Sequence, residues 1–164
     1  ALAHADIDAA HLVGKGGAIA HATAAMRKAA VLRVGGYRAQ FPHAEDIDLF
    51  LRLAEVGSLA NLPDILYEYR QHLDSICHSH TVAQRSSCRR AVDEARLRRR
   101  LPPLDYDETF SPDISLAELH RKWGWWALGA GHLASARKHA LRATWCKPFD
   151  IETLRLLACA LRGY

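Results

Sequence analysis

The chain has 164 residues, enough for one domain with a substantial core or for a core with a small satellite. Hydrophobic residues make up 49% of it, which excludes an intrinsically disordered chain. The net charge is +4, and no apolar stretch approaches the length of a membrane span. Its four cysteines form no C-x-x-C pair, which excludes a disulfide framework or a zinc site and predicts reduced thiols in the cytoplasm.

The first part of the chain predicts little regular structure. Weak apolar periodicity over residues 1–14 is typical of a short helix or loop. The start, Ala1-Leu2-Ala3, has neither Met nor a leader pattern, so we expect a fragment of a longer chain. The glycines of 14–17 and the alanine-rich stretch that follows, up to Arg27, predict a flexible loop and then a strand.

An acidic pair opens the best-defined helix. A short helical run, Lys28 to Val34, ends at Gly35, which suits the left-handed position after a helix. Beyond the loop, Glu45 and Asp46 precede apolar residues at i, i+3, i+4 and i+7: Ile47, Phe50, Leu51 and Ala54. The free N–H groups of a helix start favour carboxylates and would keep Asp46 ionised. The alternative is that Asp46 only caps the helix.

The next part of the chain first alternates apolar and polar residues and then becomes rich in arginine. Ile65, Tyr67 and Tyr69 share one face of a predicted strand, 64–72, which places Arg70 and His72 at its end. Thr81 to Arg100 predicts an arginine-rich helix, and Pro102-Pro103 stops it.

A polar linker, 105–114, separates a predicted domain of residues 1–104 from a helical tail, 115–164. The tail contains three helical runs, 115–130, 133–144 and 150–161. Small residues alternate there with tryptophans, so the tail resembles one tetratricopeptide-like hairpin plus a partner helix. Trp123, Trp125 and Trp126 are most simply core residues, and otherwise an interface.

Three motifs occur in order: Gly-Gly-Tyr-Arg at 35–38, Glu-Asp-x-Asp-Leu-Phe-Leu-Arg-Leu at 45–53, and Tyr-x-Tyr-Arg-x-His-x-Asp-Ser at 67–75. Together they resemble the C-terminal, acceptor-side half of a family 2, GT-A-type glycosyltransferase, over about residues 19–100. The resemblance implies an α/β fold, as an α+β fragment that lacks its N-terminal nucleotide-binding half. It also implies a transferase, inverting in stereochemistry, for cell-surface polysaccharide or glycan biosynthesis, inactive as this fragment alone.

The same resemblance implies roles for seven residues. Asp46 would be the general base, and Glu45 would orient it or the acceptor. Arg70 and His72 would contact the donor diphosphate, with His72 as a ligand of Mg²⁺ or Mn²⁺. His21, Thr23 and Arg27 fall in register with an acceptor-side strand, although Ala22 replaces the family's proline and His21 could equally be a core histidine. The D-x-D at Asp6-Ile7-Asp8 follows no apolar strand, so we take it as chance.

Partners follow from the charge pattern and the resemblance. The implied partners are a nucleotide-diphosphate sugar and a saccharide or lipid-linked acceptor. The basic run from Arg85 to Arg100 predicts a solvated helix face, with a peripheral contact to anionic lipid as the alternative. Nucleic acid is disfavoured because base-reading partners are missing. The competing hypothesis is a helical protein-interaction module that retains a degenerate transferase segment.

Overall fold

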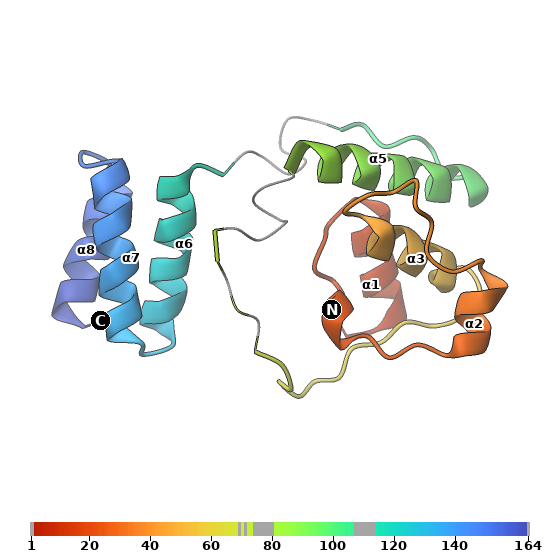
Figure 1. Ribbon diagram of the computed structural model, residues 1–164, viewed down its shortest axis with the longest axis horizontal. Coiled ribbons are helices and arrows are strands. Elements are labelled where there is room, and N and C mark those ends of the chain that lie inside the picture. The colour runs from red at the N-terminus through yellow and green to blue at the C-terminus, as the bar shows by residue number, and fades with distance from the viewer. Residues whose placement is uncertain (1, 69, 71, 74–80, 107–113, 164) are drawn as a thin grey trace. The chain divides into compact units, whose positions relative to one another are not determined.

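The computed structural model describes residues 2–68, 70, 72–73, 81–106 and 114–163. The chain divides into two compact units, Ala1–Ser111 and Pro112–Tyr164, and the division falls within the predicted linker. Regular structure in the described ranges is helical throughout (Figure 1): α1 His4–Leu12, the 3₁₀ helix η1 His21–Thr23, α2 Lys28–Arg33, α3 Glu45–Ala54, α5 Thr81–Arg98, α6 Leu116–Gly129, α7 Leu133–Cys146 and α8 Ile151–Arg162.

This all-α architecture corrects the fold class predicted from the sequence. The α/β fold and the family 2 glycosyltransferase resemblance both require strands, and the described residues contain none. A short 3₁₀ turn occupies 21–23, where Thr23 donates from its backbone N–H and its hydroxyl to the carbonyl of Ala20. Residues 65–68 have no regular structure, because a strand needs a paired neighbour and no described segment supplies one. The assignment to the GT-A fold is therefore wrong.

Helix α3 is the centre of the first unit. All seven residues from Ile47 to Leu53 are buried, so the helix is covered on every side rather than on one stripe. One cluster joins α3 to α5 through Phe41, Ile47, Leu51, Ala91, Val92 and Ala95. A second cluster, around Leu49, Phe50 and Leu53, is covered by α2 and by the loop segments near Ile19 and Leu59. Because α3 is covered on every side, its polar residues Asp48 and Arg52 are buried as well.

The two glycines after α2 form the predicted helix stop. Gly35 and Gly36 have φ values of +83° and +68°, which are left-handed and favour glycine. Gly35 N–H donates to Leu32 O at 3.1 Å and Gly36 N–H donates to Val31 O at 2.9 Å. These two bonds define a Schellman motif, so the predicted end of this helix is confirmed.

The second unit contains three helices with small residues between them. Ser115 and Glu118 form a capping box at the start of α6, and Asp150 caps α8 through Glu152 N–H at 2.9 Å. Ala136 and Ala140 of α7 are fully buried together with Leu156 and Ala160 of α8. The helices observed at 116–129, 133–146 and 151–162 confirm the three predicted helical runs.

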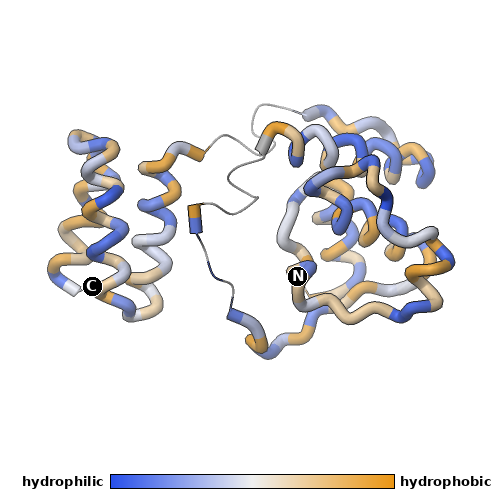
Figure 2. Tube along the Cα trace, in the orientation of Figure 1, coloured by the Kyte–Doolittle hydropathy of each residue, from blue (hydrophilic) through white to orange (hydrophobic). Residues whose placement is uncertain are grey.

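Hydrophilic residues interrupt each of these helices (Figure 2). No helix in the described ranges is long and apolar enough to cross a membrane.

Candidate functional site

The acidic pair lies where the sequence placed it, in the first turn of α3. Glu45 opens the helix after Ala44, which supplies no side-chain cap. Asp46 Oδ1 accepts a hydrogen bond from the adjacent Ile47 N–H at 2.8 Å. Asp46 therefore does not occupy the N-cap position, and the carboxylate satisfies a free donor of the first turn. The catalytic roles of Glu45 and Asp46 stay predictions.

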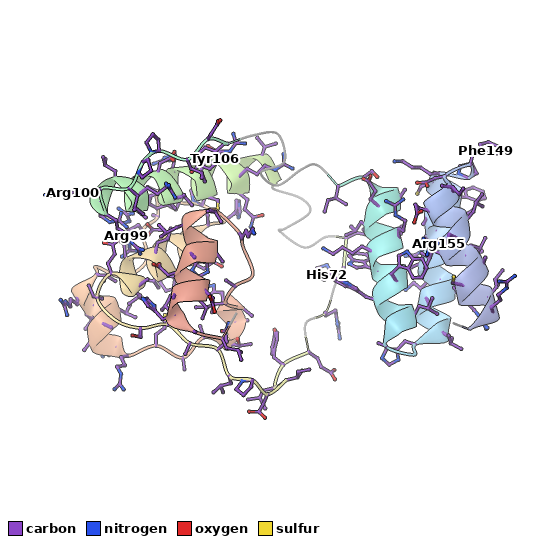
Figure 3. All side chains as sticks on the ribbon, turned by 180° about the vertical axis from the view of Figure 1, so that it is seen from behind. His72, Arg99, Arg100, Tyr106, Phe149 and Arg155 are labelled. Carbon is purple, nitrogen blue, oxygen red and sulfur yellow. The ribbon has the colours of Figure 1, made fainter. Side chains whose placement is uncertain are left out.

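The other predicted site residues are scattered. His21 Nε2 lies 2.7 Å from Tyr37 Oη, and its ring meets Phe50 edge-on at 6.1 Å. Arg27 is exposed at the start of α2. His72 is exposed on the connection between α3 and α5 (Figure 3). Arg70 is exposed on the same connection, and no described contact joins either residue to Asp46. The structure does not gather these residues into one centre.

The predicted divalent-cation site is likewise not assembled in the part of the chain that the structure describes. No group of three or more His, Cys, Asp or Glu side chains there could hold a metal ion. Binding of Mg²⁺ or Mn²⁺ by His72 stays a prediction.

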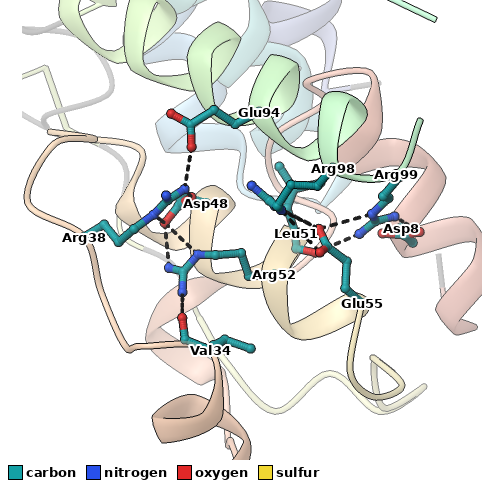
Figure 4. Close-up of polar contacts among 10 residues, drawn as sticks. All are labelled: Asp8, Val34, Arg38, Asp48, Leu51, Arg52, Glu55, Glu94, Arg98 and Arg99. Carbon is teal, nitrogen blue, oxygen red and sulfur yellow. Dashed lines mark hydrogen bonds and ion pairs between the residues drawn. The ribbon is translucent and has the colours of Figure 1, made fainter. Parts of the chain in front are cut away.

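Sequence reasoning missed the most buried ionic network of the first unit (Figure 4). Asp48 is 1% exposed and accepts from Arg52 Nη2 at 2.6 Å and from Arg38 Nε at 3.1 Å. Arg52 also donates to the carbonyls of Val34 at 2.5 Å and Gly36 at 2.7 Å. Arg38 continues the network to Glu94 of α5 at 2.9 Å. The i, i+4 spacing of Asp48 and Arg52 was the signal available in the sequence.

The network fixes the charge of Asp48. Burial alone would raise the pKa of this carboxyl group, but hydrogen bonds from Arg38 and Arg52, together with their charges, hold its pKa below the ordinary value. The network ties the Gly35-Gly36 turn, α3 and α5 together. We therefore assign it a structural role.

The arginine-rich helix α5 also differs from the expected solvated face. Arg99 pairs with Asp8 of α1 at 2.6 Å and donates to Leu51 O of α3 at 2.7 Å. Arg98 pairs with Glu55 at 2.8 Å. The basic run thus joins α5 to α1 and α3. Residues 1–111 hold fourteen Lys and Arg against fourteen Asp and Glu, so this unit has no net charge.

The uncompensated charge lies in the second unit. Residues 112–164 hold eight Lys and Arg against four Asp and Glu, a net charge of +4. Lys138, Arg142 and Lys147 are exposed and make no ion pair with any residue the structure describes. Lys138 and Arg142 lie one turn apart on α7. A basic stripe therefore follows the outer face of this helix.

Large apolar side chains lie beside that stripe. Trp145 is 90% exposed and Phe149 is 95% exposed, and Leu141 precedes Trp145 by one turn. Leu141, Thr144, Trp145 and Pro148 line a cavity of about 440 Å³. Figure 3 shows Phe149 at the turn between α7 and α8. We call this the α7 surface, and it comprises Lys138, Leu141, Arg142, Thr144, Trp145, Lys147, Pro148 and Phe149.

A histidine pair lies behind the α7 surface. His120 Nδ1 of α6 is 3.1 Å from His139 Nδ1 of α7, and Trp123 packs edge-on against both rings. Burial lowers the pKa of both histidines, and the charges of Lys138 and Arg142 lower each further. One neutral ring must donate and the other accept.

This pair predicts acid sensitivity of the second unit. A histidine whose pKa is lowered by folding contributes stability above the unfolded value of 6.5 and loses it as the pH falls toward the folded pKa. We expect the free energy of unfolding to fall below pH 6.5 by at most about 1.4 kcal/mol per pH unit for each histidine. Urea midpoints between pH 5 and 8, followed by tryptophan fluorescence, measure this slope. The double variant His120→Gln/His139→Gln should flatten it, whereas His132→Gln should not.

The chain matches no protein-family model, no curated protein and no solved structure. The interpretation of the α7 surface therefore depends on its geometry alone. It combines an apolar cavity, two nearly fully exposed aromatic rings and unpaired positive charge on one helix and its turn. This arrangement is typical of a surface that binds another molecule.

Proposed function

We propose that this protein is a helical protein-interaction module whose second unit binds an acidic amphipathic helix of a partner protein. The observation that carries the proposal is the exposure of Trp145 and Phe149 beside the cavity on the α7 surface. Aromatic side chains of this size dominate the energetics of protein interfaces. Leaving two of them in water is unfavourable, and burial under a partner removes that apolar area from water.

Charge complementarity selects the partner's polar face. Lys138 and Arg142 lie on the same helix as Trp145 and form no ion pair with a residue that the structure describes, and Lys147, whose charge also acts on Glu118, adds a third positive charge beside Phe149. Aspartates and glutamates on the partner would neutralise these charges and would steer the encounter.

The helical form of the partner follows from the shape of the α7 surface. Leu141 and Trp145 form one i, i+4 ridge, and a second helix packs against such a ridge with its own apolar stripe. The cavity between Leu141, Trp145 and Pro148 accepts one anchoring side chain.

The test uses an 18-residue peptide with leucines at i, i+3, i+4 and i+7 and glutamates on its polar face. Its matched control has lysines in place of the glutamates. We expect the acidic peptide to bind the full chain, more weakly at high salt, and the lysine peptide not to bind. Trp145→Ala should weaken binding by about 30-fold, since a central interface tryptophan contributes about 2 kcal/mol or more.

Trp126→Ala is the matched control for that variant. Trp126 is also exposed, but it lies on α6 under Lys122, outside the α7 surface. It should leave the affinity unchanged. Equal binding of both peptides, or no binding, would contradict the proposal. Binding to phosphatidylserine vesicles in place of the acidic peptide would assign the α7 surface to a membrane instead.

A further inference from the structure

The histidine pair of the second unit lies next to two cations of the α7 surface. His139 follows Lys138 on α7 and precedes Arg142 by three positions, which is about one helical turn. Its Nδ1 atom is 3.1 Å from Nδ1 of His120 on α6. His120 is 3% exposed and His139 is half-buried, whereas both cations are exposed. The pair therefore lies behind two surface charges.

The charged groups around the pair come from all three helices of the unit. Lys138 and Arg142 of α7 are the cations that act on both rings. Charged side chains of the neighbouring helices have contacts of their own: Glu118 with Ser115, Arg121 with Asp150, Lys122 with Trp126, and Arg155 with Glu152. Arg137 of α7 donates to Ala160 O, and Arg162 lies in the last turn of α8. The rings therefore respond mainly to the charges of Lys138 and Arg142.

The influence of these charges on the pair is reciprocal. Burial is the main cause of the lowered pKa of both histidines, and Lys138 and Arg142 lower each pKa further because they repel an added proton. His120 adds to the lowering of the pKa of His139. A carboxylate that pairs with either cation cancels part of this repulsion, so the rings bind a proton more readily. Linkage then requires that a proton on the pair strengthens the binding of that carboxylate by the same factor.

The hydrogen bond within the pair leaves a place for one added proton. The two Nδ1 atoms face each other, so one neutral ring donates from Nδ1 and carries a lone pair on Nε2. A proton that binds this Nε2 atom converts the donating ring to an imidazolium and leaves the hydrogen bond in place. The bond then becomes charge-assisted and stronger. The pair can thus take up one proton from water without losing its contact.

We propose that acidification strengthens the binding of an acidic partner helix to the α7 surface, because the histidine pair takes up one proton when partner carboxylates neutralise Lys138 and Arg142. This inference rests on the function proposed above and specifies how that binding is regulated. Its sign is opposite to that of the stability of the free unit. Acid weakens the free second unit, whereas a bound partner removes part of the repulsion that causes the weakening. Binding is therefore accompanied by net proton uptake.

The test measures the Kd of the acidic 18-residue peptide for the full chain at pH 8 and at pH 6, at the same ionic strength. The glutamates of the peptide are ionised at both pH values, because their ordinary pKa is about 4.3. We expect the Kd to be about three-fold lower at pH 6. His120→Gln/His139→Gln should abolish this pH dependence. His132→Gln is the matched control, because it changes the third histidine of the second unit, and it should keep the pH dependence.

Histidine pKa values measured by NMR keep the inference testable if the double histidine variant fails to fold. In the wild-type chain, the pKa of His120 and of His139 should rise when the acidic peptide binds. Lys138→Gln/Arg142→Gln should raise both pKa values without any peptide, and this variant should fold because both residues are exposed. A peptide that binds with the same Kd at pH 6 and pH 8 would overturn this inference and leave the function proposed above intact. No binding at either pH would overturn both.

Discussion

Asp48→Asn should destabilise the first unit by about 3 to 5 kcal/mol, because it leaves the guanidinium groups around a buried position without their anion. Arg52 is 7% exposed, so the group that loses its counter-charge is itself removed from water. In this variant Arg38 still pairs with Glu94, whereas the described acceptors left to Arg52 are the neutral carbonyls of Val34 and Gly36. Most of the destabilisation therefore comes from the uncompensated charge of Arg52.

The measurement must distinguish the two units. All four tryptophans lie in residues 112–164, so tryptophan fluorescence follows the second unit and the remaining change in circular dichroism follows the first. In urea, Asp48→Asn should shift only the unfolding transition of the first unit, which circular dichroism follows. Asp46→Asn is the matched control on the same helix, because among the described residues its carboxylate accepts a hydrogen bond from the adjacent Ile47 amide alone, and its interaction with the helix start is worth about 0.3 to 1 kcal/mol. A loss below 1 kcal/mol for Asp48→Asn would show that the network does not stabilise the fold.

The pH dependence of the same network follows from the lowered pKa of Asp48. Folding lowers this pKa below 3.8, so its contribution is complete above that value and is lost as the pH falls through the folded pKa. The first unit also contains His11, which is fully buried and whose pKa is lowered by burial, so it too should lose stability below pH 6.5, as the second unit does through its histidine pair. The contribution of Asp48 is lost in a more acidic range.

The helices were predictable because their signals are local. The run from Lys28 ends at Gly35 for a reason visible within eight residues, and the stripe from Ile47 to Ala54 identifies α3. The strand predicted at 64–72 is wrong at residues 64–68, 70 and 72, which the structure describes, for the opposite reason. Alternation shows that a segment fits a sheet, but whether a sheet exists depends on distant chain, and the described part supplies no partner for it.

The ionic contacts were unpredictable because they join residues far apart in sequence. Arg99 and Asp8 are 91 positions apart, and Arg38 and Glu94 are 56 apart. The periodicity of α3 indicated one buried face, which left Asp48 and Arg52 on the expected solvent side. Helix α5 and the Gly35-Gly36 turn cover that side, and the sequence pattern of α3 alone predicts neither contact.

The α7 surface was only partly foreseen. The tryptophans of 123–126 were predicted to be core or interface residues, and Trp123 is buried, but the tryptophan with the greatest exposure is Trp145. Its position after Leu141 and Arg142 could have indicated an exposed ridge. The buried positions Ala136, Ala140 and Ala143 all lie on the opposite side of the same helix.

Leu156→Ala should destabilise the second unit by about 2 to 5 kcal/mol, because a fully buried leucine is lost between three helices. Its side chain faces Gly124 of α6. A Cβ added at Gly124 would lie 2.6 Å from Leu156 Cδ2, nearer than packed atoms approach. An alanine at this position would therefore force the Leu156 side chain or its helix to shift.

This relation predicts a coupling of opposite sign in a double-mutant cycle. Gly124→Ala alone should cost about 1 to 3 kcal/mol from overpacking against Leu156. In the Leu156→Ala background the clash is gone, and the same change should stabilise α6 by up to about 1 kcal/mol through helix propensity and partial filling of the cavity. Tryptophan fluorescence in urea measures all four proteins. Additive effects would show that Leu156 moves aside freely, and the close approach of α6 and α8 would then not depend on glycine.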